Sequence, residues 1–217
     1  GLSATVAKPK LVADWLGPTG EPVALLEVED TAKPAINILR SEQRMPFGGF
    51  MAKYAIEDIY QAIANAATTL VFVNTRAQAE LLFQLLWSEN ALVLPIALYH
   101  GSLSKEQRRK TEEMMASGKL RAIVTTSALE LGIDWGDVDL VIQVGAPKGV
   151  SRLLQRIGRA NHRFEEASEA LLVPANRFEA LECQAAIEAI NQGARDGALV
   201  QPGAMDIIPQ FIINCAC

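Results

Sequence analysis

The sequence has few cysteines and histidines, and it lacks an apolar run of the roughly 18 residues that a membrane helix needs. Its three cysteines, Cys183, Cys215 and Cys217, are too few and too clustered for a disulfide framework. The two histidines, His100 and His162, have no His or Cys neighbour at metal-ligand spacing. These absences argue against a membrane protein, a disulfide-stabilised secreted domain and a metal site. They favour a soluble protein of the reducing cytoplasm.

Two kinds of catalytic loop are also absent. No Gly-x-Ser-x-Gly elbow occurs, which argues against the common hydrolase folds. No Gly-x-x-x-x-Gly-Lys-Ser/Thr loop and no Asp-Glu-x-His segment occur, so the 217 residues lack the phosphate cradle and Mg²⁺-binding carboxylates of an ATPase. The net charge of −5 argues mildly against a protein that coats nucleic acid. A local positive groove is compatible with this charge, because residues 151–163 carry four arginines and no acidic residue.

Short apolar strands alternate with amphipathic helices through the middle of the chain. The predicted strands span residues 69–73, 93–98, 120–125, 138–144 and 170–173. The predicted helices span residues 77–87, 104–116, 151–160 and 178–190, with Ser104 and Gln107 placed for a capping box. This alternation predicts an α/β fold in which helices cover both faces of a parallel sheet. Ligands of such sheets bind at the carboxyl ends of the strands.

The two ends of the chain have a different character. Residues 1–20 contain a short predicted helix that ends near Gly17-Pro18, and residues 21–53 look like a connecting region with possible strands. Residues 205–217 have the apolar pattern of the beginning of a helix, and no residue that typically ends a helix follows. We therefore expect the chain to continue into a longer protein at both ends.

One segment concentrates positive charge in a predicted helix. Its arginines are spaced four, three and four residues apart: Arg152, Arg156, Arg159 and Arg163. On a helix this spacing places them along one face, where mutual repulsion predicts an anionic partner such as a phosphate. The alternative is a solvated face whose arginines pair with carboxylates elsewhere. Gly158 favours the interpretation with an anionic partner. A glycine within a helix lowers its stability by about 1 kcal/mol, and it often marks a place where another group comes close to the backbone.

Polar residues follow three of the predicted strands. These sets are Asn74-Thr75-Arg76, His100-Gly101, and Thr125-Thr126-Ser127 with Gly132 and Asp134 beyond them. Hydroxyl and backbone N–H groups at strand ends can hold a phosphodiester backbone, and a following carboxylate can accept hydrogen bonds from a ribose. Each set alone could be only a helix N-cap with a polar lead-in. Because all of them fall at the same predicted edge, together they indicate a functional surface there.

In order and spacing, these segments resemble the conserved motifs of superfamily-two helicases. Ser3-Ala4-Thr5 resembles motif III, residues 72–76 resemble motif IV, and residues 100–102 resemble the segment just after it. Residues 125–134 resemble motif V, and residues 155–163 resemble motif VI. The finer sequence of residues 131–139 and 158–163 is similar to the large-helicase-related (Lhr) family. Residues 172–179 are similar to its bacterial, ligase-associated DEXH-box branch.

The resemblance implies a fold and a domain organisation. The fold would be the RecA-like parallel sheet of a helicase C-terminal domain. Residues 1–20 would be the tail of a first RecA-like domain, residues 21–198 the second RecA-like domain, and residues 199–217 the start of a winged-helix region. The loop and carboxylates that bind ATP and Mg²⁺ would belong to the first domain, before residue 1, so the chain alone would hydrolyse ATP negligibly.

The resemblance also implies roles for individual residues. Arg156 and Arg159 would be arginine fingers that reach the ATP phosphates, and the last motif VI position falls on either His162 or Arg163. Gly132 and Asp134 would face the nucleotide, while Ser3 and Thr5 would couple the two sites. The single-strand track would be lined by eight residues: Asn74, Thr75, Arg76, His100, Gly101, Thr125, Thr126 and Ser127.

The resemblance thus predicts the second motor domain of an ATP-dependent, 3′-to-5′ DNA helicase that acts in repair. Expected partners are the first RecA-like domain, single-stranded or tailed DNA (with RNA or a hybrid as alternatives) and a DNA ligase. A competing hypothesis is a non-catalytic module that kept the helicase fold and binds nucleic acid or protein without a nucleotide. Gly132, Asp134 and the arginine pair argue against it, because a pure binding module needs none of them. A small-molecule α/β enzyme would require a nucleophile or cofactor loop that the sequence lacks.

Overall fold

The core of the chain is one parallel sheet of six strands. The computed structural model describes residues 6–16, 23–26, 33–49, 51–129, 138–160, 168–196 and 207–216. In space the strand order is β1-β6-β5-β2-β4-β3, and every neighbouring pair is parallel. In chain order the strands are β1 (Ala35–Ile38), β2 (Thr69–Phe72), β3 (Ile96–Tyr99), β4 (Ala122–Thr125), β5 (Leu140–Val144) and β6 (Glu169–Val173).

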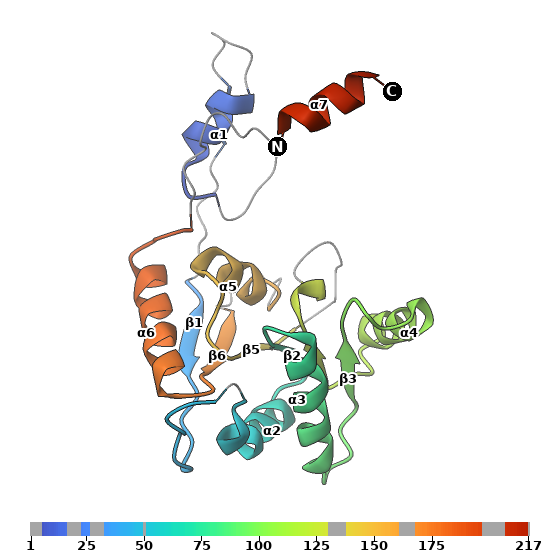
Figure 1. Cartoon of the computed structure of the whole chain (residues 1–217). Coiled ribbons are helices and arrows are strands. Elements are labelled where there is room, and N and C mark those ends of the chain that lie inside the picture. The colour runs from blue at the N-terminus through green and yellow to red at the C-terminus, as the bar shows by residue number, and fades with distance from the viewer. Residues whose placement is uncertain are drawn as a thin grey trace.

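Helices cover both faces of this sheet (Figure 1). The longer helices are α2 (Ile56–Asn65), α3 (Arg76–Ser88), α4 (Lys105–Ala116), α5 (Val150–Ile157) and α6 (Arg177–Asn191). Short 3₁₀ turns, η1 (Lys53–Ala55) and η2 (Ser127–Leu129), precede α2 and follow β4. The architecture is the α/β fold predicted from the sequence.

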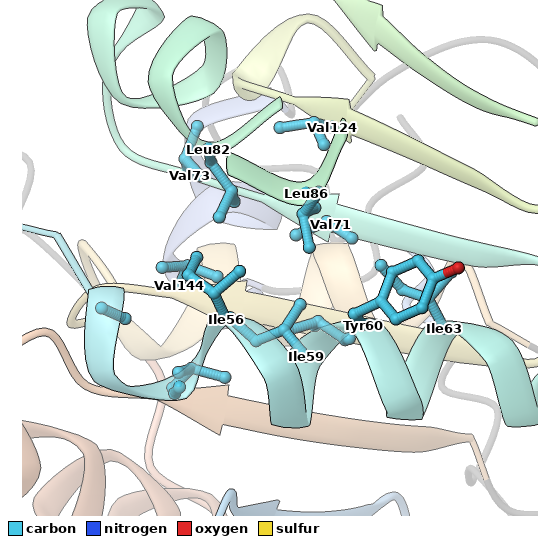
Figure 2. Packing of buried hydrophobic residues seen from close by; sticks show 14 of the residues in the cluster. Ile56, Ile59, Tyr60, Ile63, Val71, Val73, Leu82, Leu86, Val124 and Val144 are labelled. Atoms are coloured by element: carbon cyan, nitrogen blue, oxygen red, sulfur yellow. The ribbon is translucent and has the colours of Figure 1, made fainter. Parts of the chain in front are cut away.

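The two faces of β2 show how the strand pattern builds two cores. Successive side chains of a strand point to opposite faces. Val71 and Val73 join the core under α2 and α3, whereas Leu70 and Phe72 join the core under α5 and α6. Figure 2 shows the first core, in which Ile56, Ile59, Tyr60 and Ile63 of α2 pack against strand valines and against Leu82 and Leu86 of α3. A continuous apolar strand is the expected sequence for a sheet covered on both sides.

Several sequence predictions are confirmed and others need correction. The predicted capping box of α4 is present, with the Ser104 side chain accepting from the Gln107 backbone N–H at 3.2 Å. Strand β3 begins at Ile96 rather than at residue 93, because Val93 has a positive φ of 52° and Pro95 cannot donate a ladder hydrogen bond. Strand β1 lies inside the predicted connecting region, where it pairs with β6. Helix α2 was not predicted.

Two further helices lie near the ends of the chain. Helix α1 (Pro9–Leu16) matches the short helix predicted there, and α7 (Ile207–Ala216) matches the apolar helical start. The side chains described in α7 are all exposed. Among the helices that the structure describes, none is long and apolar enough to cross a membrane. The predicted domain boundaries at residues 20 and 198 lie outside the described residues and stay predictions.

Candidate functional site

The polar segments that follow β2, β4 and β3 lie side by side at one edge of the sheet. These three strands are consecutive in the sheet, and Phe72 and Tyr99 are both in register with Thr125. The strands therefore end at the same level, and the Val73 backbone N–H still donates to the Thr125 carbonyl at 2.9 Å. The prediction that these polar sets share an edge is confirmed.

The three polar residues after β2 differ in their contacts and in their exposure. The Asn74 side-chain amide nitrogen donates to the Ala146 carbonyl at 2.9 Å, so it ties this segment to the one after β5. Thr75 is exposed and is the N-cap of α3, where its hydroxyl accepts from the Gln78 backbone N–H at 3.2 Å. Arg76 is exposed and donates from Nη1 to the Ser102 hydroxyl, which links it to the segment after β3.

His100 is a buried residue that organises the turn after β3. Only 3% of its surface is exposed. Its Nδ1 accepts from the Ser102 backbone N–H at 3.3 Å, and its Nε2 lies 3.4 Å from Oε1 of Glu80 on α3. Gly101 is exposed, and nothing lies within 4 Å of the place where a Cβ would be. Of this predicted pair, Gly101 is accessible to a ligand, while His100 holds the backbone of the turn.

The hydroxyl residues after β4 differ in exposure. Thr125 is fully buried, and its Oγ1 donates to the Thr126 carbonyl at 3.2 Å. Thr126 is also buried, whereas Ser127 is exposed at the start of η2. The sequence alone does not separate these three neighbours, because their exposure depends on how far the strand continues into the sheet. The accessible residues of the candidate track are thus Thr75, Arg76, Gly101 and Ser127.

The arginine segment differs from the single helical face predicted for it. Helix α5 (Val150–Ile157) ends with Gly158 as its C-cap, so the predicted extension to residue 160 is wrong. The interpretation of Gly158 as a mid-helix glycine is wrong for the same reason. Arg152 is exposed, Arg156 is buried, and Arg159 is half-buried in a turn where its N–H donates to the Arg156 carbonyl at 3.0 Å. The three arginines therefore differ in exposure, and Arg159 lies beyond the end of the helix that carries the other two.

Arg156 lies in the domain interior, with 3% of its surface exposed. Its guanidinium carbon lies 5.0 Å from the ring centroid of Phe72, and its Nη1 donates to Oε1 of Gln143. The amide nitrogen of Gln143 donates to the carbonyls of Val144 and Gly145 at 3.1 and 3.2 Å. Sequence reasoning missed Gln143. A single polar residue in the apolar run 140–144 was the available signal, since buried polar groups need partners.

Glu179 is a second residue that the sequence did not single out. Its Oε2 accepts backbone N–H groups from Ala146 at 3.1 Å and from Ala175 at 2.8 Å, which joins the segments after β5 and β6. Nearby, the Tyr54 hydroxyl donates to the Pro174 carbonyl at 2.8 Å. Burial first, and then nearby Cys183, Asp58 and Glu179, raise the pKa of Tyr54 to about 12.

Several residues that the resemblance assigns to the site lie outside the described part of the chain. They are Ser3, Thr5, Gly132, Asp134, His162 and Arg163. Their roles stay predictions. Within the described residues the candidate site consists of the shared strand edge and the half-buried Arg159. Buried side chains such as His100 and Arg156 lie beneath them.

Comparisons with known proteins identify the fold and the family of the chain. The family model of the helicase conserved C-terminal domain matches residues 54–164. The ATP-dependent helicase Lhr-Core of Methanocaldococcus jannaschii is 30% identical over 218 residues, which cover 100% of this chain and 26% of that protein. The Lhr helicase/probable uracil glycosylase of Mycolicibacterium smegmatis is 44% identical over 118 residues, which cover 54% of this chain and 8% of that protein.

A solved structure of the Mycobacterium smegmatis helicase Lhr bound to ssDNA and AMP-PNP matches with a TM-score of 0.88 and 34% identity. The match covers 98% of this chain and 28% of that one. The C-terminal domain of the DEAD-box protein Dbp5, 19% identical with a TM-score of 0.56 over 75% of this chain and 87% of that one, shares the fold. The chain spans about a quarter or less of the length of the curated Lhr relatives. It has the RecA-like fold of a helicase C-terminal domain, belongs to that family, and within it is of the Lhr type.

Proposed function

We propose that this chain is the second motor domain of an ATP-dependent DNA helicase or translocase. It would supply an arginine finger and part of the single-strand track, and it would not hydrolyse ATP alone. The observation that carries this proposal is the shared edge, at which the segments after β2, β4 and β3 begin at the same level. Support also comes from the similar Lhr helicase, whose structure contains ssDNA and AMP-PNP.

The exposed residues of the edge are suited to contact a nucleic-acid backbone. Arg76 offers a guanidinium to phosphate oxygens, while Thr75 and Ser127 offer hydroxyl groups. Gly101 has open space above it, so a strand can approach its backbone closely. His100, Thr125 and Thr126 are buried, and Asn74 is engaged with Ala146, so these four would hold the track in shape. Contacts of this kind position a strand without reading its bases.

On the nucleotide side, the half-buried Arg159 is the best finger candidate in the described part of the chain. It follows the C-cap of α5, where backbone hydrogen bonds from Arg159 and Ala160 to Arg156 and Ile157 hold its main chain in a turn. Arg156 is engaged with Gln143 and Phe72, so its role would be to hold α5 on the sheet. Gly132, Asp134 and Arg163 remain proposed nucleotide contacts.

ATP with Mg²⁺, held mainly by a preceding RecA-like domain, would supply the energy by hydrolysis of its phosphoanhydride bond. In this chain a fixed guanidinium suits that ligand, because it stabilises charge on phosphate oxygens without being deprotonated. The hydrogen-bonded turn holds the backbone of Arg159, from which its guanidinium would reach the phosphates. The finger would thus complete a site built mostly by another domain.

The finer parts of the proposal rest on sequence resemblance. We infer 3′-to-5′ movement, a function in DNA repair, a cytoplasmic location and an association with a DNA ligase. The polarity follows from the resemblance to the helicase family, and the cytoplasmic location from the few cysteines. The function in repair and the ligase association follow from the similarity of residues 172–179 to the bacterial ligase-associated branch. RNA or a hybrid strand is an alternative substrate, because DNA and RNA share the phosphate groups that such contacts bind.

The test compares this chain with a longer protein that includes the preceding domain and its Gly-Lys-Thr loop. DNA-stimulated ATP hydrolysis should be absent in the chain and present in the longer protein. Arg159→Ala should then lower kcat by about 10³-fold or more, as loss of an arginine finger does. Arg109→Ala is the matched control, because Arg109 is an exposed arginine that pairs with Glu113 at 2.8 Å on α4. Full activity of the Arg159→Ala protein would contradict the finger assignment, and inactivity of every form would favour a non-catalytic binding module.

A further inference from the structure

The chain leaving α6 turns back toward the start of the arginine-bearing helix α5. Gly193 has a φ of +72°, its N–H donates to the Ile190 carbonyl at 2.9 Å, and the next N–H, of Ala194, donates to Ala189 at 2.8 Å. This is the glycine-terminated Schellman end of a helix, which reverses the chain direction. The turn delivers Asp196, three residues after Gly193, to the first turn of α5.

Two reciprocal hydrogen bonds join Asp196 to that turn. The Ser151 backbone N–H donates to Oδ2 of Asp196 at 2.7 Å, and the Asp196 backbone N–H donates to the Ser151 hydroxyl at 3.0 Å. Helix α5 has Gly149 as its N-cap and no side-chain cap of its own. The first N–H groups of a helix need outside acceptors, and a carboxylate there also interacts favourably with the helix dipole. Asp196 thus provides from 45 residues away what an N-cap side chain normally provides.

The backbone at Gly149 is shaped around this carboxylate. Gly149 has a φ of +119°, a conformation that residues with a side chain rarely adopt. A Cβ at this position would lie 2.6 Å from Oδ2 of Asp196. Glycine therefore meets two requirements at once, the backbone angle and the close approach of Asp196.

We propose that Asp196 is a positioning residue for Arg159. It fixes the first turn of α5, and through this helix of about two turns it sets the direction of the arginine beyond Gly158. This inference rests on the proposed function for the catalytic importance of Arg159. A misplacement of about 1 Å in such a group can cost about 100-fold in rate.

The contact itself is tested by amide hydrogen exchange in this chain. Asp196→Ala should make the amides of residues 151–154 exchange about 2- to 30-fold faster, the range expected for loss of a helix cap. Asp196→Asn should change exchange less, since its amide oxygen still accepts from Ser151. Glu182→Ala, which removes an exposed acidic residue of α6, is the control and should leave these amides unchanged. Unchanged exchange in Asp196→Ala would overturn the proposal.

The effect on Arg159 is tested by ATPase kinetics in the longer protein. Asp196→Ala should lower kcat about 3- to 30-fold, with an unchanged KM for ATP and unchanged affinity for single-stranded DNA, and Asp196→Asn should retain most activity. If Arg159→Ala lowers kcat and Asp196→Ala does not, the positioning proposal is overturned while the proposed function stands. If Arg159→Ala has no effect, the proposed function fails and the link to Arg159 fails with it. The exchange experiment then still decides whether Asp196 fixes α5.

Discussion

The guanidinium of Arg156 lies over the ring of Phe72, with 5.0 Å between the guanidinium carbon and the ring centroid. Arg156 comes from α5 and Phe72 from the last position of β2, two residues before the first residue of the candidate track, Asn74. The Gln143 side chain of β5 accepts a hydrogen bond from the same guanidinium. The buried side chain of Arg156 thus joins α5 to strands β2 and β5. The proposed contacts with nucleic acid and nucleotide depend on the relative positions of this helix and these strands.

Replacement of Arg156 should destabilise the domain. Arg156→Ala leaves the buried Oε1 of Gln143 without its donor and removes the cation from Phe72, so we expect a loss of about 1–3 kcal/mol in the free energy of unfolding. Arg156→Lys should restore little, because an ammonium lacks the planar fork that contacts both partners. Urea unfolding followed by circular dichroism measures the loss, with the exposed Arg109→Ala as a control that should not change. An unchanged midpoint for Arg156→Ala would show that its contacts contribute nothing.

Gly149 should tolerate no side chain. Gly149→Ala forces an unfavourable φ of +119° and a contact of 2.6 Å with Asp196, so stability should fall by about 1–3 kcal/mol. Gly48→Ala is the matched control, because nothing lies within 4 Å of its Cβ position. Adding Asp196→Ala to Gly149→Ala should recover part of the loss by removing the clash. Thermal unfolding of the four proteins checks this, and equal melting temperatures for Gly149→Ala and wild type would refute it.

The cysteines should differ in reactivity toward thiol reagents. Burial first, with Glu179 and Glu182 adding, raises the pKa of the Cys183 thiol to about 12, whereas Cys215 is exposed. Since the thiolate is the reactive form, iodoacetamide at pH 8 should modify Cys215 and leave Cys183 intact in the folded chain. Peptide mass spectrometry distinguishes the two sites, and 6 M urea is the control that should expose Cys183. Equal labelling of both in the folded chain would contradict the burial of Cys183.

Alkaline pH should weaken the fold partly through Tyr99. Burial, and then the hydrogen bond that its hydroxyl donates to Glu112 at 2.6 Å, raise the pKa of Tyr99 to about 12. The unfolded chain loses this proton near pH 10, so the stabilisation is complete below about pH 10 and is lost as pH rises toward 12. Tyr99→Phe has no such proton to retain. Between pH 8 and pH 11, the free energy of unfolding measured in urea should therefore fall less for Tyr99→Phe than for the wild type. Equal losses of stability in the two proteins would exclude Tyr99 as a cause.

Local sequence patterns were sufficient for the fold class and for the edge that carries the candidate site. Apolar strands alternating with helical periods predicted a parallel sheet, and Ser104 with Gln107 predicted the start of α4. Strand ends in a parallel sheet share one edge, so the order of the polar segments was enough to place Asn74–Arg76, His100 and Thr125 together. These features follow from short-range geometry, namely strand alternation, helix capping and the direction of parallel strands.

The tertiary structure decided which of those residues are accessible and what each contacts. Helical spacing predicted one arginine face, but that spacing applies only while the helix continues, and α5 ends at Ile157. Whether Arg156 points inward depends on Gln143 and Phe72, which reach it from two other elements. In the same way Asp196 caps a helix 45 residues away, a contact for which the sequence contains no local signal. The sequence by itself determined the fold class and the shared edge through local periodicity, while long-range packing determined the strand order and how the arginines are held.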